Sequence, residues 1–545
     1  MRRNALSSLA LVFTPIIIVV AGCSSSSPSA KAATSPSSGR AAAESAPCHT
    51  TRPAPPTVVP VAGTQHDYTM TAFDGAQILF HWYPLDHRAA TVLMGPGWGE
   101  SGATENSGTG LFGDSPIGQL QGGGYHVLTW DPRGFGKSTG TIEVDSKDAE
   151  ARDVQGLIDW VATQPLAQLD APTDPRVGMV GGSYGGGIQL QTAAIDCRVD
   201  AIVPTIAWHS LTTSLNKAQT VKIGWSKLLY SAAVGRKLDP HITSSYNAAS
   251  TTGVISPDDR AWFASRGPGD QIAKIKIPTL FIQGTVDTLF TLDEAVTNYR
   301  ILAARGVPTA MLWYCGGHGV CLTNAGDTKR SQHATTLWLQ RWLQRDRSVD
   351  TGPPIDIIDQ HGDRFTARRD PIGTAELVGA DGAGRLPLTA DGGSGPAHAV
   401  SSAGGPIDGI AAGIAPARAK NAVNVVITAK TGAPSVGAPK LDITYSGTAP
   451  AGDRPTRVFA QLVDDGSGLV LGNQVTPIAV TLDGRPHTAT VALEMIAHTL
   501  APGDTITLQI VATTVAYSLP RFGGSIDFTT IHIALPKAVG LVKTS

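Results

Sequence analysis

A serine lies at the centre of a glycine-rich turn, residues 181–185 (Gly-Gly-Ser-Tyr-Gly), between an apolar strand pattern and a helical one. The strand is expected over 177–180 and the helix from near Gly187. A chain that turns this sharply holds the serine in strained geometry, so its neighbours must be small. Because such a turn exposes the hydroxyl at the edge of a sheet, Ser183 is the predicted nucleophile.

A serine hydroxyl is a poor nucleophile at neutral pH, so it needs a base, and the base needs an acid to hold it in the right tautomer. In sheets with this turn the acid follows one later strand and the histidine follows the next. Asp287 comes after an expected strand at 277–283, and His318 comes after one at 310–314. We therefore predict His318 as general base and Asp287 as its acid. Two carboxylates are alternative acids: Asp293 and Glu294.

Two backbone amides are predicted to stabilise a developing oxyanion. The Tyr184 N–H lies next to the serine at the start of the helix, where the helix dipole favours negative charge. The second donor should come from the loop after an early strand, and Trp98 follows the strand at 91–94 through Gly-Pro-Gly. The alternative is that this glycine-rich loop only redirects the chain.

The pattern along the 545 residues predicts two folded regions after an N-terminal extension. Strand and helix patterns alternate over 58–350, which is typical of an α/β sheet domain, and 205–270 is mostly helical, as in a cap. Period-two runs between turn signals follow a Pro/Gly break, so we expect a linker at 351–370 and a β-sandwich at 371–545.

The N-terminus is typical of an exported protein. Residues 1–22 carry two arginines and an apolar run, as in a signal peptide, and 20–23 (Val-Ala-Gly-Cys) resemble a bacterial lipobox. Lipidation at Cys23 would anchor the protein to the membrane outside the cytoplasm, and the Ser/Ala/Pro-rich segment 23–57 would be a disordered tether. The alternative is an ordinary secretory signal. A net charge of −2 does not suggest a nucleic-acid-binding surface.

Export would allow the other cysteines to pair. Three pairings of Cys48, Cys197, Cys315 and Cys321 are possible. We favour Cys315 with Cys321, since the loop between them is short and glycine-rich, which leaves Cys48 with Cys197. The alternative is that some are buried thiols. A bond between Cys315 and Cys321 would restrain the loop that carries His318.

Several motifs resemble the peptidase S15 group, which contains X-prolyl dipeptidyl aminopeptidases and cocaine-esterase-like acyl esterases. They include 73–75 (Phe-Asp-Gly), 131–140 (Asp-Pro-Arg-Gly-Phe-Gly-Lys-Ser-Thr-Gly), 181–185, and, near the C-terminus, 457–460 and 501–504. The resemblance implies an α/β-hydrolase fold, an active site under the helical cap, and a jelly-roll-like C-terminal domain. It also implies hydrolysis of esters, amides or short X-Pro peptides.

The chain departs from this pattern in places that matter for the substrate. Cocaine-esterase-like members use a tyrosine hydroxyl in the loop where this chain has Gly97-Trp98-Gly99. No residue can be assigned to hold the free α-amino group of an X-Pro substrate. No metal or organic cofactor is expected, because neither metal-binding nor phosphate-loop motifs are present. The alternative function is a non-catalytic cell-envelope binding lipoprotein on the same scaffold.

Overall fold

A computed structural model describes residues 64–104, 117–396 and 413–544. The predicted signal peptide, the predicted lipidation site Cys23, the tether and Cys48 lie outside the described residues. All described residues belong to one compact unit. Within them, no helix is both long and apolar enough to cross a membrane.

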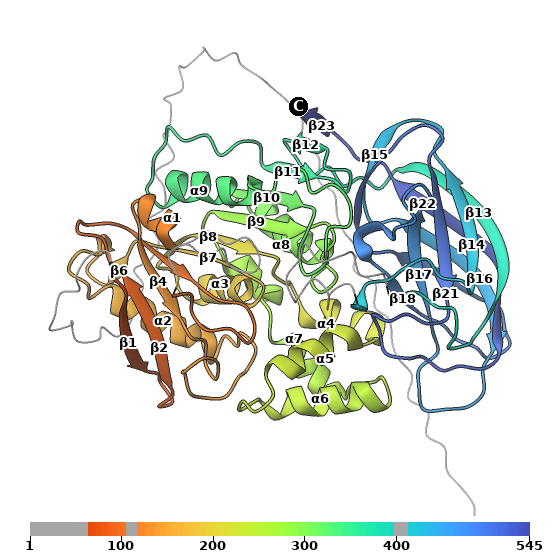
Figure 1. Ribbon diagram of the computed structural model, residues 1–545, viewed down its shortest axis with the longest axis horizontal. Helices are drawn as coiled ribbons and strands as arrows, with labels where there is room; N and C mark the ends of the chain where they lie inside the picture. Colours follow the sequence, from red (N-terminus) through yellow and green to blue (C-terminus); the bar gives the residue numbers. More distant parts are fainter. Residues whose placement is uncertain (1–63, 105–116, 397–412, 545) are drawn as a thin grey trace, which may run out of the picture. The chain divides into compact units, whose positions relative to one another are not determined.

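A mixed sheet forms the centre of the N-terminal region (Figure 1). Its strands, in spatial order, are β1 (His66–Thr71), β2 (Gln77–Tyr83), β4 (His126–Trp130), β3 (Thr91–Met94), β7 (Val177–Gly182), β8 (Val199–Thr205), β9 (Thr279–Gly284), β10 (Thr309–Tyr314), β11 (Ile355–Ile358), β12 (Arg364–Ala367) and β23 (Val542–Thr544). Neighbours from β4 to β11 run parallel, and the strands at both edges are antiparallel. The parallel strands therefore end at one common edge.

Helices cover both faces of this sheet. One apolar core joins the strands to α2 (Glu150–Val161), α3 (Tyr184–Ile195) and α8 (Leu292–Ala304). A second core joins the opposite face to α1 (Ile117–Gly122) and α9 (Arg330–Trp342). Strands buried on both faces are typical of parallel sheets. A small hairpin, β5 (Leu169–Ala171) and β6 (Asp174–Pro175), lies outside the sheet.

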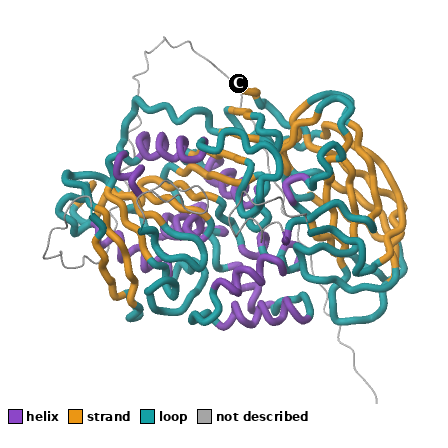
Figure 2. Tube along the Cα trace, viewed as in Figure 1, coloured by secondary structure: helices purple, strands orange, loops and turns teal. Residues whose placement is uncertain are grey.

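A group of helices is inserted between β8 and β9, where the sequence predicts a cap. They are α4 (Leu211–Ser214), α5 (Ile223–Ala232), α6 (Pro240–Thr251) and α7 (Pro257–Ala264), with 3-10 turns at Lys217–Gln219 (η1) and Gly269–Lys274 (η2). The N-termini of α6 and α7 carry ordinary helix-start signals: the side-chain oxygens of Asp239 and Ser256 cap these helices, and a proline follows each cap. Figure 2 shows these helices grouped beside the mainly β-stranded C-terminal region, which they contact through hydrogen bonds from Arg454 to Thr251 and from Arg457 to Thr220.

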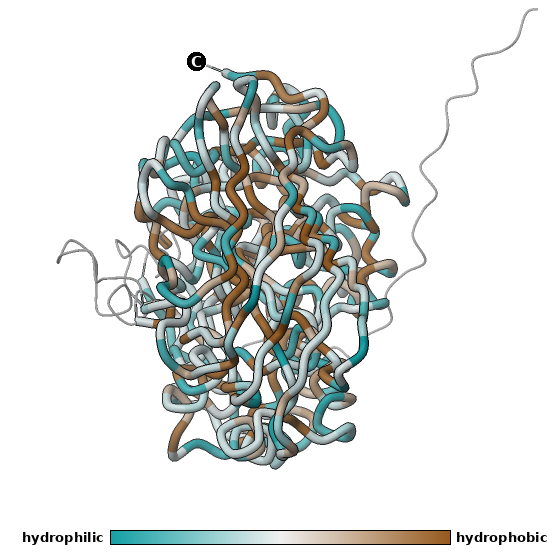
Figure 3. Tube along the Cα trace, turned by 90° about the vertical axis from the view of Figure 1, so that its right-hand side faces the viewer, coloured by the Kyte–Doolittle hydropathy of each residue, from teal (hydrophilic) through white to brown (hydrophobic). Residues whose placement is uncertain are grey.

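The C-terminal region consists of two four-stranded sheets around one apolar core. The first contains β13 (Glu376–Pro387), β22 (Ser525–Pro536), β16 (Lys440–Thr448) and β19 (His487–Ala492); the second contains β14 (Ala422–Thr428), β21 (Thr505–Val511), β17 (Arg457–Asp464) and β18 (Thr476–Ala479). Strands β15 (Ala433–Gly437) and β20 (Ile496–Leu500) pair separately, and η3 (Leu471–Asn473) is a short turn. Buried and exposed residues alternate along most of β14, half-buried and exposed residues alternate along β19, and Figure 3 shows hydrophobic and hydrophilic residues interleaved here.

The structure departs from the expected linker at 351–370. This segment contains β11 and β12, which extend the large sheet next to β10. Ile355, Ile357 and Ile358 are buried there, so apolar burial outweighs the Pro/Gly break that suggested a linker. The last strand, β23, also pairs with β12 in the large sheet and not with the sandwich sheets.

Candidate active site

The predicted nucleophile lies directly between β7 and α3. Ser183 has φ 55° and ψ −116°, a sparsely populated conformation for a residue with a side chain. The neighbouring glycines are required by space: a Cβ on Gly185 would lie 2.1 Å from the Gly95 carbonyl oxygen, and one on Gly181 would lie 2.6 Å from it. The motif at 181–185 therefore forms the tight strand-to-helix turn that its glycines predict.

The structure brings Ser183, His318 and Asp287 into one hydrogen-bonded chain. His318 Nε2 lies 2.8 Å from Ser183 Oγ, and His318 Nδ1 lies 2.7 Å from Asp287 Oδ2. All three side chains are buried. The rings of Trp225 and Phe290 pack edge-on against the imidazole, with centroids 5.6 and 5.1 Å away. The imidazole is therefore placed to accept the hydroxyl proton at Nε2 while Asp287 holds its Nδ1–H.

Asp287 is oriented by the backbone that follows it. Its Oδ1 accepts hydrogen bonds from the N–H groups of Leu289 (3.0 Å) and Phe290 (2.8 Å), so Oδ2 faces His318. The alternative acids lie elsewhere. Glu294 accepts hydrogen bonds from the backbone of His209 and Ser210, and Asp293 lies near Lys217.

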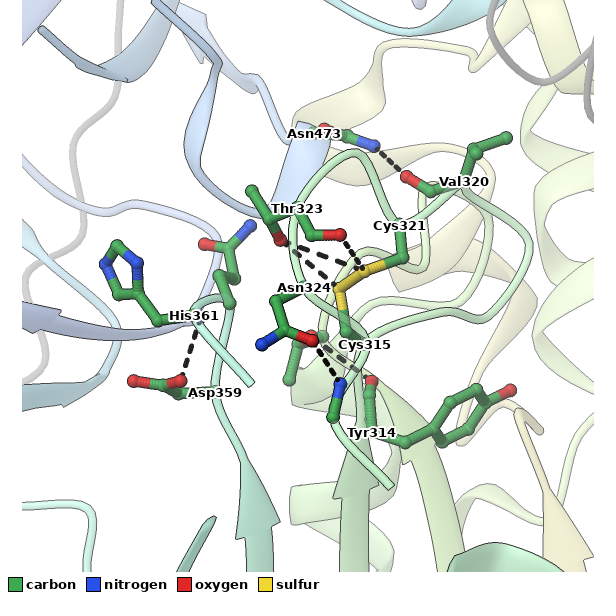
Figure 4. The surroundings of a disulfide bond; sticks show 12 residues. Tyr314, Cys315, Val320, Cys321, Thr323, Asn324, Asp359, His361 and Asn473 are labelled. Carbon is green, nitrogen blue, oxygen red and sulfur yellow. Dashed lines mark hydrogen bonds between the residues drawn. A yellow bond between two sulfur atoms is a disulfide. The ribbon is translucent and has the colours of Figure 1, made fainter. Parts of the chain in front are cut away.

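The loop that carries His318 is closed by the predicted disulfide between Cys315 and Cys321 (Figure 4). Its glycines allow it to pack against the acid loop: Gly317 has φ +112°, and a Cβ on Gly319 would lie 1.9 Å from the Val286 carbonyl oxygen. Cys197 is also disulfide-bonded. Its predicted partner, Cys48, lies outside the described residues, so that pairing stays a prediction.

The two residues predicted to donate to the oxyanion, Tyr184 and Trp98, line the same cavity as Ser183. The Tyr184 N–H is the first of α3, and first-turn amides have no intrahelical acceptor. Trp98, on the loop after β3, has its ring 5.2 Å from that of Tyr184, and its Nε1 donates to the Leu229 carbonyl. Within the described part of the chain, the Trp98 backbone N–H donates no hydrogen bond.

A cavity of about 910 Å³, including space open to solvent, lies between Ser183 and the cap. The cap supplies most of its wall: Leu211, Leu215, Asn216, Val221, Ser226, Leu229, Tyr230, Ile242, Ser245, Tyr246, Ala249, Ile255 and Phe263. The remaining wall comes from Trp98, Val144, Ser183, Tyr184, Trp208, Leu289 and Phe290. A mostly apolar pocket with few polar groups beside a nucleophile is typical of small-molecule sites.

Three residues that sequence reasoning missed hold the loops of the site. From the C-terminal region, Asn473 Nδ2 donates to the Val320 carbonyl at 2.9 Å, and Gln474 Nε2 donates to the Asp287 carbonyl. From the cap, the buried Lys222 Nζ donates to the carbonyls of Thr288 (3.0 Å) and Leu289 (2.9 Å), and burial lowers its pKa. No local sequence signal marks these residues, because each contact joins segments far apart in the chain.

The motif at 131–140 has a structural role behind the nucleophile. Asp131 accepts hydrogen bonds from the N–H groups of Gly102 (2.8 Å) and Lys137 (2.7 Å), and Gly136 has φ +51° where a Cβ would meet the Asp131 carboxylate. The Arg133 guanidinium pairs with Asp153 at 2.6 Å and Asp74 at 2.5 Å. These contacts fix the loop and do not place a reactive group at Ser183.

Buried carboxyl groups lie next to that loop. Burial raises the pKa of Glu150 to about 7 and that of Asp153 to about 6. The pKa of Asp145 is raised well above its ordinary value by burial and by the nearby Glu150. Its two oxygens have no hydrogen-bond partner within the described part of the chain. No cluster of three or more His, Cys, Asp or Glu that could bind a metal occurs among the described residues.

Comparison with known proteins agrees with the fold and the motifs. Residues 52–320 match the model of the X-Pro dipeptidyl-peptidase (S15) family. A CocE/NonD family hydrolase from Staphylococcus aureus is 13% identical, with a TM-score of 0.65 over 86% of this chain and 93% of that one. An α-amino acid ester hydrolase is 14% identical, with a TM-score of 0.61 over 88% of this chain and 98% of that one. At these identities the likeness concerns the fold.

A curated relative, a polyketide transferase from Gibberella fujikuroi, is 22% identical over 191 residues, 32% of this chain. The chain spans only 54% of that protein's length. The S15 match covers the strand-to-helix turn at Ser183, the acid loop and the histidine. Over residues 52–320 the chain is therefore similar to the X-Pro dipeptidyl-peptidase (S15) family, and it shares its fold with the two hydrolases named above.

Proposed function

We propose that this protein hydrolyses ester or amide bonds through an acyl-enzyme formed on Ser183. The observation that carries the proposal is the hydrogen-bonded chain from Ser183 through His318 to Asp287 at the end of β7. A serine in this position can attack a carbonyl once its proton has a place to go, and a buried carboxylate stabilises the imidazolium that forms.

In the first half-reaction, Ser183 Oγ attacks the carbonyl carbon while His318 Nε2 takes the hydroxyl proton. The Tyr184 and Trp98 N–H groups then donate to the oxyanion. When the tetrahedral intermediate collapses, the bond to the alcohol or amine breaks, and His318 returns the proton to that leaving group. In the second half-reaction His318 removes a proton from water and the hydroxide adds to the acyl carbonyl carbon. The bond from that carbon to Ser183 Oγ then breaks, His318 returns the proton to Oγ, and the carboxylic acid is released.

The test compares a short-chain acyl ester with a Gly-Pro chromogenic amide, using the mature protein from just after Cys23 and a Ser183→Ala variant. We expect ester hydrolysis that depends on Ser183. Cleavage of the amide as well would make the protein an X-prolyl peptidase. Hydrolysis that persists in Ser183→Ala, or a folded protein inactive on both substrates, would contradict the proposal and favour a binding lipoprotein.

We further propose that the protein is exported and lipid-anchored at Cys23. The lipobox-like residues 20–23 support this, and so does the disulfide between Cys315 and Cys321, because such bonds persist in oxidising compartments. Metabolic labelling with a radioactive fatty acid should mark the full chain but not a Cys23→Ser variant. Equal labelling of both would contradict the anchor.

A further inference from the structure

The wall of the cavity beside Ser183 lacks charge. Among the residues described, those that line it include no Asp, Glu, Lys, Arg or His. Its polar groups are an asparagine amide and serine and tyrosine hydroxyls. Since a charged group enclosed there would lose water without gaining a partner, the cavity favours a neutral ligand.

Two carboxylates near the site do not line the cavity, so neither is a candidate for binding an amino group there. Glu100 follows Trp98 on the same loop, but its Oε2 accepts a hydrogen bond from the Gly97 N–H at 2.9 Å. Burial raises the pKa of this carboxyl, which disfavours its charged form. Asp145 lies close behind Tyr184 but lines a different, smaller cavity. Neither carboxylate is placed to neutralise an ammonium group in the large cavity.

The position of the cavity indicates which half of a substrate it holds. Ser183 and both side chains next to the predicted oxyanion donors, Trp98 and Tyr184, form its sheet-side wall, and the cap forms the opposite wall. The group that stays bound to Ser183 between the two half-reactions can be enclosed in this way. The leaving group has to depart before water enters, so it needs a path to solvent.

We propose that the cavity under α4–α7 is an acyl pocket, and that the substrates are esters or amides of neutral, apolar carboxylic acids. This rests on the proposed function and specifies its substrate class. It predicts that the enzyme discriminates against substrates with a free α-amino group, including X-Pro dipeptides. The apolar wall supplies the binding energy, and Ser183 supplies the chemistry.

The test measures kcat/KM for p-nitrophenyl acetate, butyrate, hexanoate and octanoate, together with hexanoate esters of alcohols of increasing length. Each added acyl methylene should raise kcat/KM about fourfold until the pocket is full, which corresponds to about 0.8 kcal/mol per CH₂. Lengthening the alcohol should change kcat/KM much less. An ester of norleucine, which has the hexanoyl skeleton plus an α-amino group, should be at least about tenfold poorer than hexanoate.

Two variants locate the pocket. Ala249 is buried and lines the cavity from α6, so Ala249→Phe should move the preferred acyl chain to a shorter length. Leu229→Ala should enlarge the pocket and move the preference to a longer chain. Ser250 is the exposed neighbour of Ala249, and Ser250→Phe is the control that should leave the profile unchanged.

The outcomes separate this inference from the proposed function. A flat acyl series, a preference set by the alcohol, or a preference for the norleucine ester would overturn the acyl pocket while leaving Ser183-dependent hydrolysis intact. An unchanged chain-length profile in both pocket variants would do the same. If none of the esters were cleaved in a Ser183-dependent way, the proposed function would fail, and the pocket with it.

Discussion

The hydrogen bond from Gln474 to the backbone of Asp287 leads to a prediction about how the C-terminal region supports catalysis. Gln474 is buried, and its amide reaches the carbonyl of the acid from a segment 187 residues later in the chain. A Gln474→Ala variant leaves that buried carbonyl without this donor, a loss of about 1–3 kcal/mol. If the loop that carries Asp287 shifts as a result, His318 is misaligned, and kcat should fall by about ten- to a hundredfold.

The matched control is Gln461→Ala. Gln461 is also a buried glutamine of the C-terminal region, and its Nε2 donates to the Ala417 carbonyl and to Gln509 at 2.9 Å each. Both variants should lower the free energy of unfolding, measured by urea denaturation. Only Gln474→Ala should lower kcat for an acyl ester with little change in KM. An unchanged kcat in Gln474→Ala, or the same loss of kcat in both variants, would refute a positioning role for Gln474.

Three further perturbations test other parts of the site. Asp287→Asn should lower kcat about 10⁴-fold by removing the acceptor that fixes the His318 tautomer, as steady-state kinetics would show; retained activity would exclude Asp287 as the acid. Replacing both Cys315 and Cys321 with serine should lower the free energy of unfolding by about 2 kcal/mol, as measured by denaturation, and should lower kcat in an ester assay. Full activity would mean that the disulfide does not position His318. Because the folded-state pKa of Asp145 is raised, its contribution to stability is present below the ordinary aspartate pKa and is lost as pH rises toward the folded-state value. Unfolding free energies measured from about pH 5 to 8 should therefore fall less steeply with pH in Asp145→Asn, and parallel curves would contradict the raised pKa.

The parts of the site that local sequence determines could be predicted. Glycines are needed at 181 and 185, because a Cβ at either position would collide with the Gly95 carbonyl oxygen, so the sequence motif alone identifies the turn. Asp287 and His318 follow strands, and the order of strands along the chain places them at the same sheet edge. The helix after Ser183 begins at Tyr184, earlier than the pattern predicts, because glycines at 185–187 hide the helical signal.

The parts that depend on long-range contacts could not be predicted. The motif at 131–140 resembles a family signature, but only the structure shows that Asp131 and Arg133 hold backbone and buried carboxylates. The residues Asn473 and Gln474 look like ordinary loop residues until the chain brings them to the His318 and Asp287 loops. Strands β11 and β12 were hidden by the Pro/Gly break that precedes them.

The most direct test of the central claim is covalent labelling with a fluorophosphonate, read by peptide mass spectrometry on the mature protein. We predict one adduct, on Ser183, which is absent in Ser183→Ala and forms much more slowly in His318→Ala. A folded protein that does not react, or that reacts at another residue, would contradict Ser183 as the nucleophile.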